Sequence, residues 1–151
     1  MHLTVRDRTE VLYLDRLAGN ASVPVVSSIG SRLPMHATGV GKVLLAHAPL
    51  EVQVGVLSDL RRITPYTITQ PGMLRRQLAR VLRDGYATTV EEMSLGACSV
   101  AVPIRGEQAV VAALGIVVPS LRNDRGKHVA ALQVAARGIG RALVASRVDR
   151  A

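Results

Sequence analysis

The stretch from residue 36 to 42 has the residue types best suited to binding chemistry. It reads HATGVGK and leads into an apolar run at residues 43–48, so we expect a small-residue loop that enters a helix. A helix start exposes unpaired backbone N–H groups and the positive end of the helix dipole, and glycines there let a ligand approach the backbone closely. A Walker phosphate loop is excluded because Val43, not a hydroxyl residue, follows Lys42. The pattern predicts a site for a carboxylate or a similar small anion, with a tight turn packed beneath a sheet as the alternative.

Other residues that could do chemistry are scattered along the chain. Ser99, His36 and Glu91 could form a hydrolytic triad, but no nucleophile-elbow pattern places them together. His36 and Cys98 could ligate a metal, yet two isolated candidates lack the paired spacing of a metal site. We therefore expect no enzyme activity, no metal and no cofactor. We interpret Glu91 and Glu92 as a solvated pair or as partners of an arginine, and three further histidines as surface or structural residues: His2, His47 and His128.

The composition is typical of one folded domain that spans residues 1–151. With 48% hydrophobic and 20% charged residues, the chain is neither disordered nor long enough for two full cores. No apolar run reaches the roughly 20 residues of a membrane span, no signal peptide is visible, and the single cysteine excludes an internal disulfide. We expect a cytoplasmic protein without a membrane partner.

The net charge of +8 raises the possibility of nucleic-acid binding. Three tyrosines and no Phe or Trp leave no stacking platform for single strands. The sequence also shows no helix-turn-helix pattern, no zinc-finger spacing and no long basic run. We therefore expect no direct DNA contact by this chain.

The periodicity of apolar residues predicts strands near the start of the chain, then helices, then two more strands before a last helix. Residues 2–6 and 11–17 alternate as in a hairpin, and residues 19–31 read as a loop in which Val23, Val25 and Val26 allow another strand. Residues 98–104 and 110–118 are dense in β-branched residues and flank a turn. This order predicts an α/β (α+β) fold, with an antiparallel sheet of about five or six strands flanked by helices.

Three further helices are expected after the first one. Pro49 is suited to open a helix near residues 50–59, and Pro71 to open one that Gly85 ends. The apolar face of this third helix is assigned to Leu74, Leu78, Val81 and Leu82. Asn123 is expected to cap a long last helix whose apolar positions step by three and four: Val129, Leu132, Ala136, Ile139 and Leu143.

Four segments in the same order resemble motifs of the IclR family of bacterial transcriptional regulators. Residues 32–46, RLPMHATGVGKVLLA, resemble the family stretch LPxHATAxGKxLLA, and residues 63–68, ITPYTI, look like its T-x-x-T-I segment. GYA at 85–87, EE at 91–92 and VAVPI at 100–104 are similar to the family pattern GYA…EE…G…AxPV, which residues 111–116 continue. The match runs from about residue 2 to 145.

The resemblance implies a GAF-like effector-binding domain. Family members also carry an N-terminal winged helix-turn-helix domain, which is absent from this chain, so we expect the sensor half of a transcriptional regulator. The implied partners are a small organic acid, a second copy in a homodimer or homotetramer, and DNA only through the missing domain. The alternative is a stand-alone small-molecule-binding or oligomerisation module.

The resemblance also implies a ligand site. The family's small-acid binders use loop amides at the positions of Gly39 and Val40, an aspartate at that of Thr89 and a cysteine or similar residue at that of Ser99. They carry serines where this chain has Gly115 and Val117, so we expect a carboxylate-binding mouth with a more apolar, roomier interior. An aromatic or alicyclic acid then fits better than glyoxylate or pyruvate, unless Thr89, Ser99 and Val117 are ordinary strand residues. The expected ligand-binding residues are Met35, Gly39, Val40, Gly41, Thr89, Leu95, Ser99, Gly115 and Val117.

Overall fold

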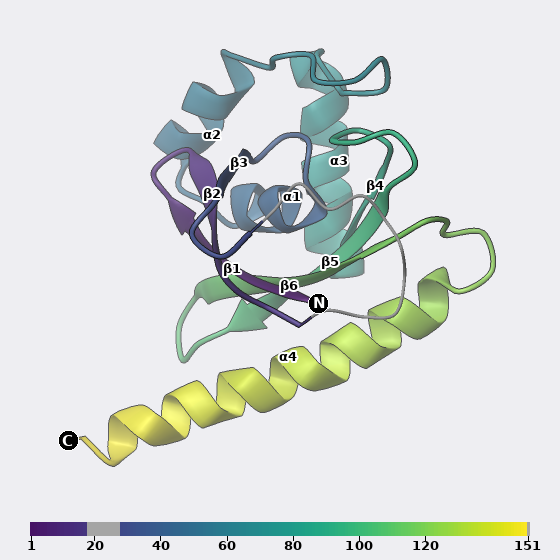
Figure 1. Ribbon diagram of the computed structural model, residues 1–151. Helices are drawn as coiled ribbons and strands as arrows, with labels where there is room; N and C mark the ends of the chain where they lie inside the picture. The colour runs from purple at the N-terminus through teal and green to yellow at the C-terminus, as the bar shows by residue number, and fades with distance from the viewer. Residues whose placement is uncertain (18–27, 151) are drawn as a thin grey trace.

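The computed structural model describes residues 1–17 and 28–150 (Figure 1). Their elements are β1 (His2–Asp7), β2 (Glu10–Arg16), β3 (Arg32–Pro34), α1 (Gly39–Ala46), α2 (Leu50–Leu57), α3 (Pro71–Asp84), β4 (Ala87–Val90), β5 (Cys98–Arg105), β6 (Val110–Val118) and α4 (Arg125–Val148). Val23, Val25 and Val26, the possible extra strand, lie outside the described residues. No helix in the described ranges is long and apolar enough to cross a membrane.

Within these residues the strands form one antiparallel sheet in the order β3-β2-β1-β6-β5-β4. The order confirms the expected sheet of five or six strands flanked by helices. It also places the first strand of the chain beside the last, because β1 pairs with β6 through His2 opposite Gly115. Two hairpins far apart in the sequence therefore share one continuous surface.

Helix α1 lies against one face of the sheet, and all eight of its residues are buried. Figure 1 shows α1 enclosed between the sheet and the segment that carries α2 and α3. Helix α3 packs its buried residues Leu74, Leu78 and Val81 into the same core as α1. The sequence placed Leu82 on this face as well, but Leu82 is 58% exposed because only one stripe of α3 is covered.

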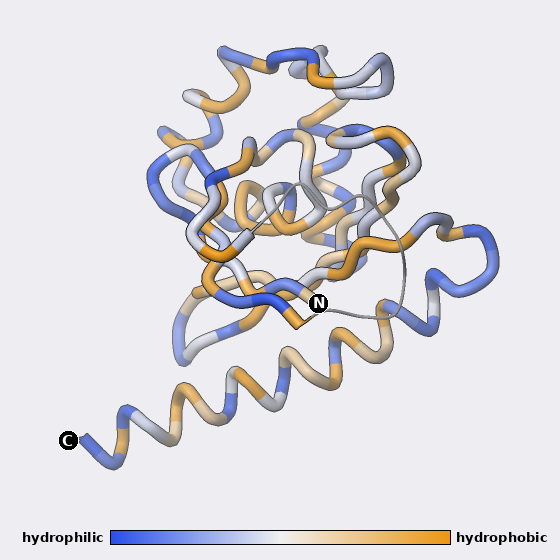
Figure 2. The backbone as a smooth tube through the Cα atoms, viewed as in Figure 1, coloured by the Kyte–Doolittle hydropathy of each residue, from blue (hydrophilic) through white to orange (hydrophobic). Residues whose placement is uncertain are grey.

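Helix α4 covers the opposite face of the sheet, as Figure 1 shows. Leu132 and Ala136 pack on the side chains of β5 and β6 that point away from α1. Gly140 lets the helix approach the sheet, because a Cβ there would lie 2.6 Å from the carbonyl oxygen of Arg105. Figure 2 shows hydrophobic and hydrophilic residues alternating along α4, as expected for a helix with one covered side. The expected cap is wrong: the helix begins after Asp124, one residue beyond Asn123.

One buried ion pair joins α1 to the loop between β4 and β5. The Lys42 Nζ donates to Glu92 Oε1 at 2.6 Å and to Gln77 Oε1 of α3 at 2.5 Å. Burial lowers the pKa of Lys42, while Glu92 acts to raise it. The sequence assigned Glu92 to solvent or to an arginine; Glu92 is instead 7% exposed and bound to a lysine.

Replacing one partner of this pair should cost much of the stability. Glu92→Gln leaves the Lys42 ammonium buried without a countercharge, so we expect the free energy of unfolding in urea to fall by about 3–5 kcal/mol. Asp59→Asn is the control, because the Asp59–Arg61 pair is exposed and such pairs contribute about 1 kcal/mol or less. Lys42→Met combined with Glu92→Gln should be more stable than Glu92→Gln alone. Equal losses for Glu92→Gln and Asp59→Asn would contradict a structural role for the pair.

Candidate functional site

The start of α1 has two backbone N–H groups available to a ligand. Thr38 caps the helix: its Oγ1 accepts from the Gly41 N–H at 3.1 Å and donates to the Pro34 carbonyl at 2.9 Å. Among the described residues, no hydrogen bond is made by the N–H groups of Gly39 or Val40, which precede Gly41 in the first turn. The helix begins at Gly39, four residues before the apolar run at 43–48 with which it was expected to start. The amides that the sequence analysis assigned to a loop are therefore the first amides of the helix.

Close packing against the sheet fixes this helix start. A Cβ at Gly39 would lie 2.7 Å from Ser99 Oγ, and a Cβ at Gly115 would lie 2.7 Å from Val40 Cγ1. Real Cβ atoms do not approach other atoms so closely, so a larger residue at either position would displace the helix or the side chain that it meets. The free N–H groups are thereby held over β5 and β6.

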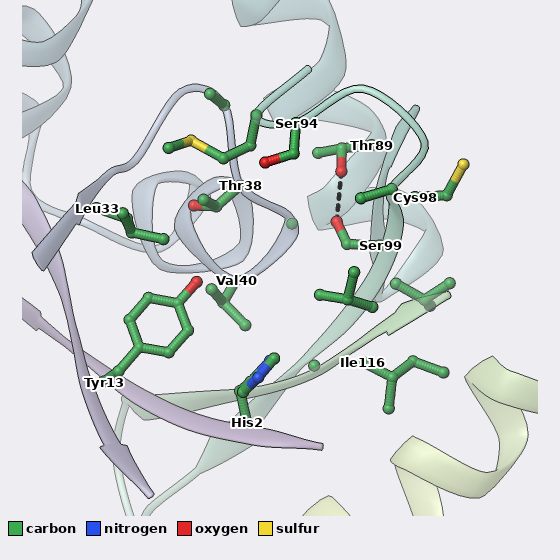
Figure 3. A pocket seen from close by; sticks show the side chains of 17 residues that line it. His2, Tyr13, Leu33, Thr38, Val40, Thr89, Ser94, Cys98, Ser99 and Ile116 are labelled. Carbon is green, nitrogen blue, oxygen red and sulfur yellow. Dashed lines mark hydrogen bonds between the residues drawn. The ribbon is translucent and has the colours of Figure 1, made fainter. Parts of the chain in front are cut away.

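A cavity of about 50 Å³ lies between this helix start and the sheet, several times the roughly 10–15 Å³ that one water molecule needs. Figure 3 shows that its walls come from both hairpins, from α1 and from the loop that follows β4. Most of the wall is apolar. The residues that line it are His2, Tyr13, Leu33, Ala37, Thr38, Gly39, Val40, Thr89, Met93, Ser94, Ala97, Cys98, Ser99, Val100, Gly115, Ile116 and Val117.

Two hydroxyl groups stand at the β4–β5 side of the cavity. Thr89 and Ser99 are opposite each other in the strand pair, and their hydroxyl oxygens are 2.5 Å apart (Figure 3). Because one hydroxyl donates to the other, the remaining proton of the pair is free for a ligand or another acceptor. Together with the N–H groups of Gly39 and Val40, this pair makes one side of the cavity a donor-rich surface.

The side chains of the opposite side are uncharged at neutral pH. Burial, together with the nearby chain N-terminus and Arg16, lowers the pKa of His2 to about 4. Burial raises the pKa of Tyr13 to about 12. The helix start is therefore the part of the cavity that attracts an anion, through its dipole and its free amides.

The loop between β4 and β5 closes the cavity and is tied down by two threonines. The Thr64 Oγ1 donates to the Glu91 carbonyl at 2.6 Å, and the Thr67 Oγ1 donates to the Glu92 carbonyl at 2.7 Å. Glu91 adopts a φ of 55°, and its carboxylate accepts from the Gly96 N–H at 2.8 Å. The two threonines of the ITPYTI segment thus have a structural task that its sequence pattern did not reveal.

The structure brings six of the nine expected ligand-binding residues together around the cavity: Gly39, Val40, Thr89, Ser99, Gly115 and Val117. The other three lie elsewhere. Met35 is buried in the core behind α1, and the Gly41 amide is already occupied by Thr38. Leu95 is 57% exposed at the tip of the loop, because the loop directs Met93 and Ser94 inward instead.

The residues considered for catalysis do not assemble. His36 Nε2 lies 2.8 Å from the Arg61 carbonyl oxygen, while Ser99 pairs with Thr89 and Glu91 with the loop. Across residues 1–17 and 28–150, no group of three His, Cys, Asp or Glu side chains could hold a metal. His47 is a structural residue, as expected, since its Nδ1 lies 3.0 Å from the Val43 carbonyl oxygen. His2, also expected to be a surface or structural residue, lines the cavity.

Several cavity residues had no signal in the sequence. His2 and Tyr13 lie on the first hairpin, and they face the cavity because β1 pairs with the distant strand β6 as well as with its neighbour β2. Met93 and Ser94 were missed because the course of a loop does not follow from residue periodicity.

The fold and the cavity define a class: small mixed α/β domains with a pocket between a helix start and an antiparallel sheet. The family model described as the bacterial transcriptional regulator IclR C-terminal domain matches residues 1–143. The chain therefore belongs to the IclR family, as the effector-binding domain of such a regulator.

Individual relatives agree with this assignment. The chain is 38% identical to the Pca operon regulatory protein of Acinetobacter baylyi over 128 residues, 80% of this chain and 46% of that protein. It superposes with a TM-score of 0.90 on an IclR homolog from Microbacterium hydrocarbonoxydans in complex with 4-hydroxybenzoate, at 43% identity, over 95% of this chain and 60% of that one. A double mutant of the PobR inducer-binding domain from Acinetobacter, in complex with 3-hydroxybenzoic acid, gives 0.78 at 31% identity, over 91% and 85%. The chain spans about half the length of the curated relatives it matches.

The geometry of the helix start predicts different costs for two glycines. A Cβ at Gly41 would lie 2.4 Å from the Met35 carbonyl oxygen, so Gly41→Ala forces the backbone apart. We expect it to lower the free energy of unfolding by about 1–3 kcal/mol. Gly72, also in the first turn of a helix, has open space where its Cβ would stand, and Gly72→Ala should be neutral or stabilising. Thermal or urea denaturation measures both, and equal behaviour of the two variants would contradict the packing described here.

Proposed function

We propose that this chain binds a small aromatic carboxylic acid in the cavity beneath α1 and does not catalyse a reaction. The observation that carries the proposal is the pair of free N–H groups at Gly39 and Val40, which point to an anion in an otherwise apolar cavity. The Thr89–Ser99 pair adds one hydroxyl donor beside them. A carboxylate on an apolar ring matches this distribution of donors and apolar wall.

The relatives support the same ligand class. The Microbacterium homolog and the PobR domain were crystallised with hydroxybenzoates, and both resemble this chain over nearly its whole length. The Gly115 and Val117 positions carry no polar side chain here, so the cavity lacks donors that would favour a small, highly polar acid over an aromatic one.

We further propose that binding controls DNA binding by a winged helix-turn-helix domain outside this chain, in a cytoplasmic homodimer or homotetramer. A ligand shifts such an equilibrium only through different affinities for the two states, with coupling of about 1–3 kcal/mol in typical cases. The affinity can differ between two states in which α1 and the loop between β4 and β5 are placed differently, because both segments form part of the cavity wall.

Binding of simple aromatic acids tests the proposal. Calorimetric titration and thermal shift should show binding of benzoate and 4-hydroxybenzoate, with about 2.7 kcal/mol of added stability at 100 times the dissociation constant. Benzamide keeps the ring without the charge, so it should bind far more weakly. Gly39→Val fills the space before Ser99 and should abolish binding.

Gly72→Val is the matched control, since that glycine borders open space and lies outside the cavity. Its affinity for both acids should equal that of the wild type. Benzamide binding as tightly as benzoate, or unchanged binding by a folded Gly39→Val variant, would contradict the proposal.

A further inference from the structure

The hydroxyl of Tyr13 is a polar group that faces the cavity without a protein partner. The side chain is only 6% exposed, and among residues 1–17 and 28–150 nothing makes a hydrogen bond to its hydroxyl. In Figure 3 the hydroxyl points into the cavity toward Val40, across from the Ser99–Thr89 pair. A tyrosine hydroxyl that opens onto a cavity without a protein partner can form a hydrogen bond with a polar group of a ligand.

The surroundings hold this hydroxyl in place. Both backbone polar groups of Tyr13 are hydrogen-bonded. The N–H donates to the Ser31 carbonyl at 3.1 Å, and the carbonyl accepts from the Gly30 N–H at 2.8 Å. Its ring meets the His2 ring edge to face, with centroids 5.5 Å apart. A donor that is fixed before binding loses little entropy when a ligand arrives, which favours selectivity.

The sheet order separates Tyr13 from the anion-binding end. Tyr13 lies on β2, whereas the free amides of α1 stand over β5 and β6, next to Ser99 and Gly115. Strands β2 and β5 are three places apart, or about 14 Å at the usual spacing of about 4.8 Å, before side chains reach inward. Tyr13 therefore approaches the cavity from the β2 side, whereas the Thr89–Ser99 pair lies on the β4–β5 side.

The chemistry of the two ends differs. The helix start offers a positive dipole and suits a carboxylate, while Tyr13 and His2 are both uncharged at neutral pH and suit a neutral group. We infer that Tyr13 selects hydroxylated aromatic acids over unsubstituted ones by a hydrogen bond to the ligand's ring hydroxyl. This inference rests on the proposed function. It adds the residue that binds the ligand's ring hydroxyl, at the end of the ring away from the carboxylate.

Tyr13→Phe tests the inference because it removes the hydroxyl and keeps the ring that packs on His2. Affinities for benzoate, 3-hydroxybenzoate and 4-hydroxybenzoate are measured by calorimetry at neutral pH for the wild type and the variant. At least one hydroxybenzoate should bind the wild type about three- to tenfold more tightly than benzoate, the contribution of one neutral hydrogen bond. In Tyr13→Phe this advantage should vanish, so that the hydroxybenzoates bind no more tightly than benzoate does.

The control is Tyr66→Phe, the same change at a tyrosine that is 59% exposed, which should alter no affinity. An unchanged preference in Tyr13→Phe, no preference in the wild type, or an equal loss for benzoate and the hydroxybenzoates would each overturn the inference. In the last case Tyr13 would either bind the carboxylate that all three acids share or stabilise the fold. If benzoate binds and only the preference is missing, the proposed function stands; if none of the three acids binds, both fail together.

Discussion

The site depends on the buried ion pair between Lys42 and Glu92. Lys42 belongs to α1, whose first turn offers free amides, and Glu92 belongs to the loop that closes the cavity. The pair is supported by Gln77 of α3, so three segments distant in the sequence meet at one ammonium group. A buried charge without its partner is far costlier than the intact pair, which makes the separation of α1 from the loop unfavourable.

Glycines and threonines complete this arrangement. Gly39 and Gly115 remove the side chains that would keep α1 away from the sheet. Thr64 and Thr67 donate hydrogen bonds to the consecutive carbonyl groups of Glu91 and Glu92. The result is a closely packed frame around a small cavity with donors at one end. Such a frame links the occupancy of the cavity to the relative positions of α1 and the loop, the two parts that a ligand would contact.

The sequence predicts much of this fold, because alternating and helical periods mark the two hairpins, α3 and α4 plainly. It misplaces the start of α1, because glycines disfavour helices and Gly39 and Gly41 were therefore assigned to a loop. In the structure Gly39 belongs to the helix, since the sheet leaves little room for a larger residue there. The Lys42–Glu92 pair spans 50 residues, a separation that no local pattern reports. For the site, the HATGVGK stretch points to the amides, and the family resemblance points to Thr89 and Ser99. His2 and Tyr13 enter the site only through the pairing of β1 with β6.

The central claim is that a carboxylate binds the first two amides of α1. Titration of the ¹⁵N-labelled chain with benzoate, followed by amide NMR shifts, tests it most directly. The account predicts the largest changes at Gly39 and Val40, and a smaller one at Gly41, whose N–H already donates to Thr38. Saturable binding that leaves the Gly39 and Val40 signals unmoved, while signals elsewhere in the chain shift, would contradict it.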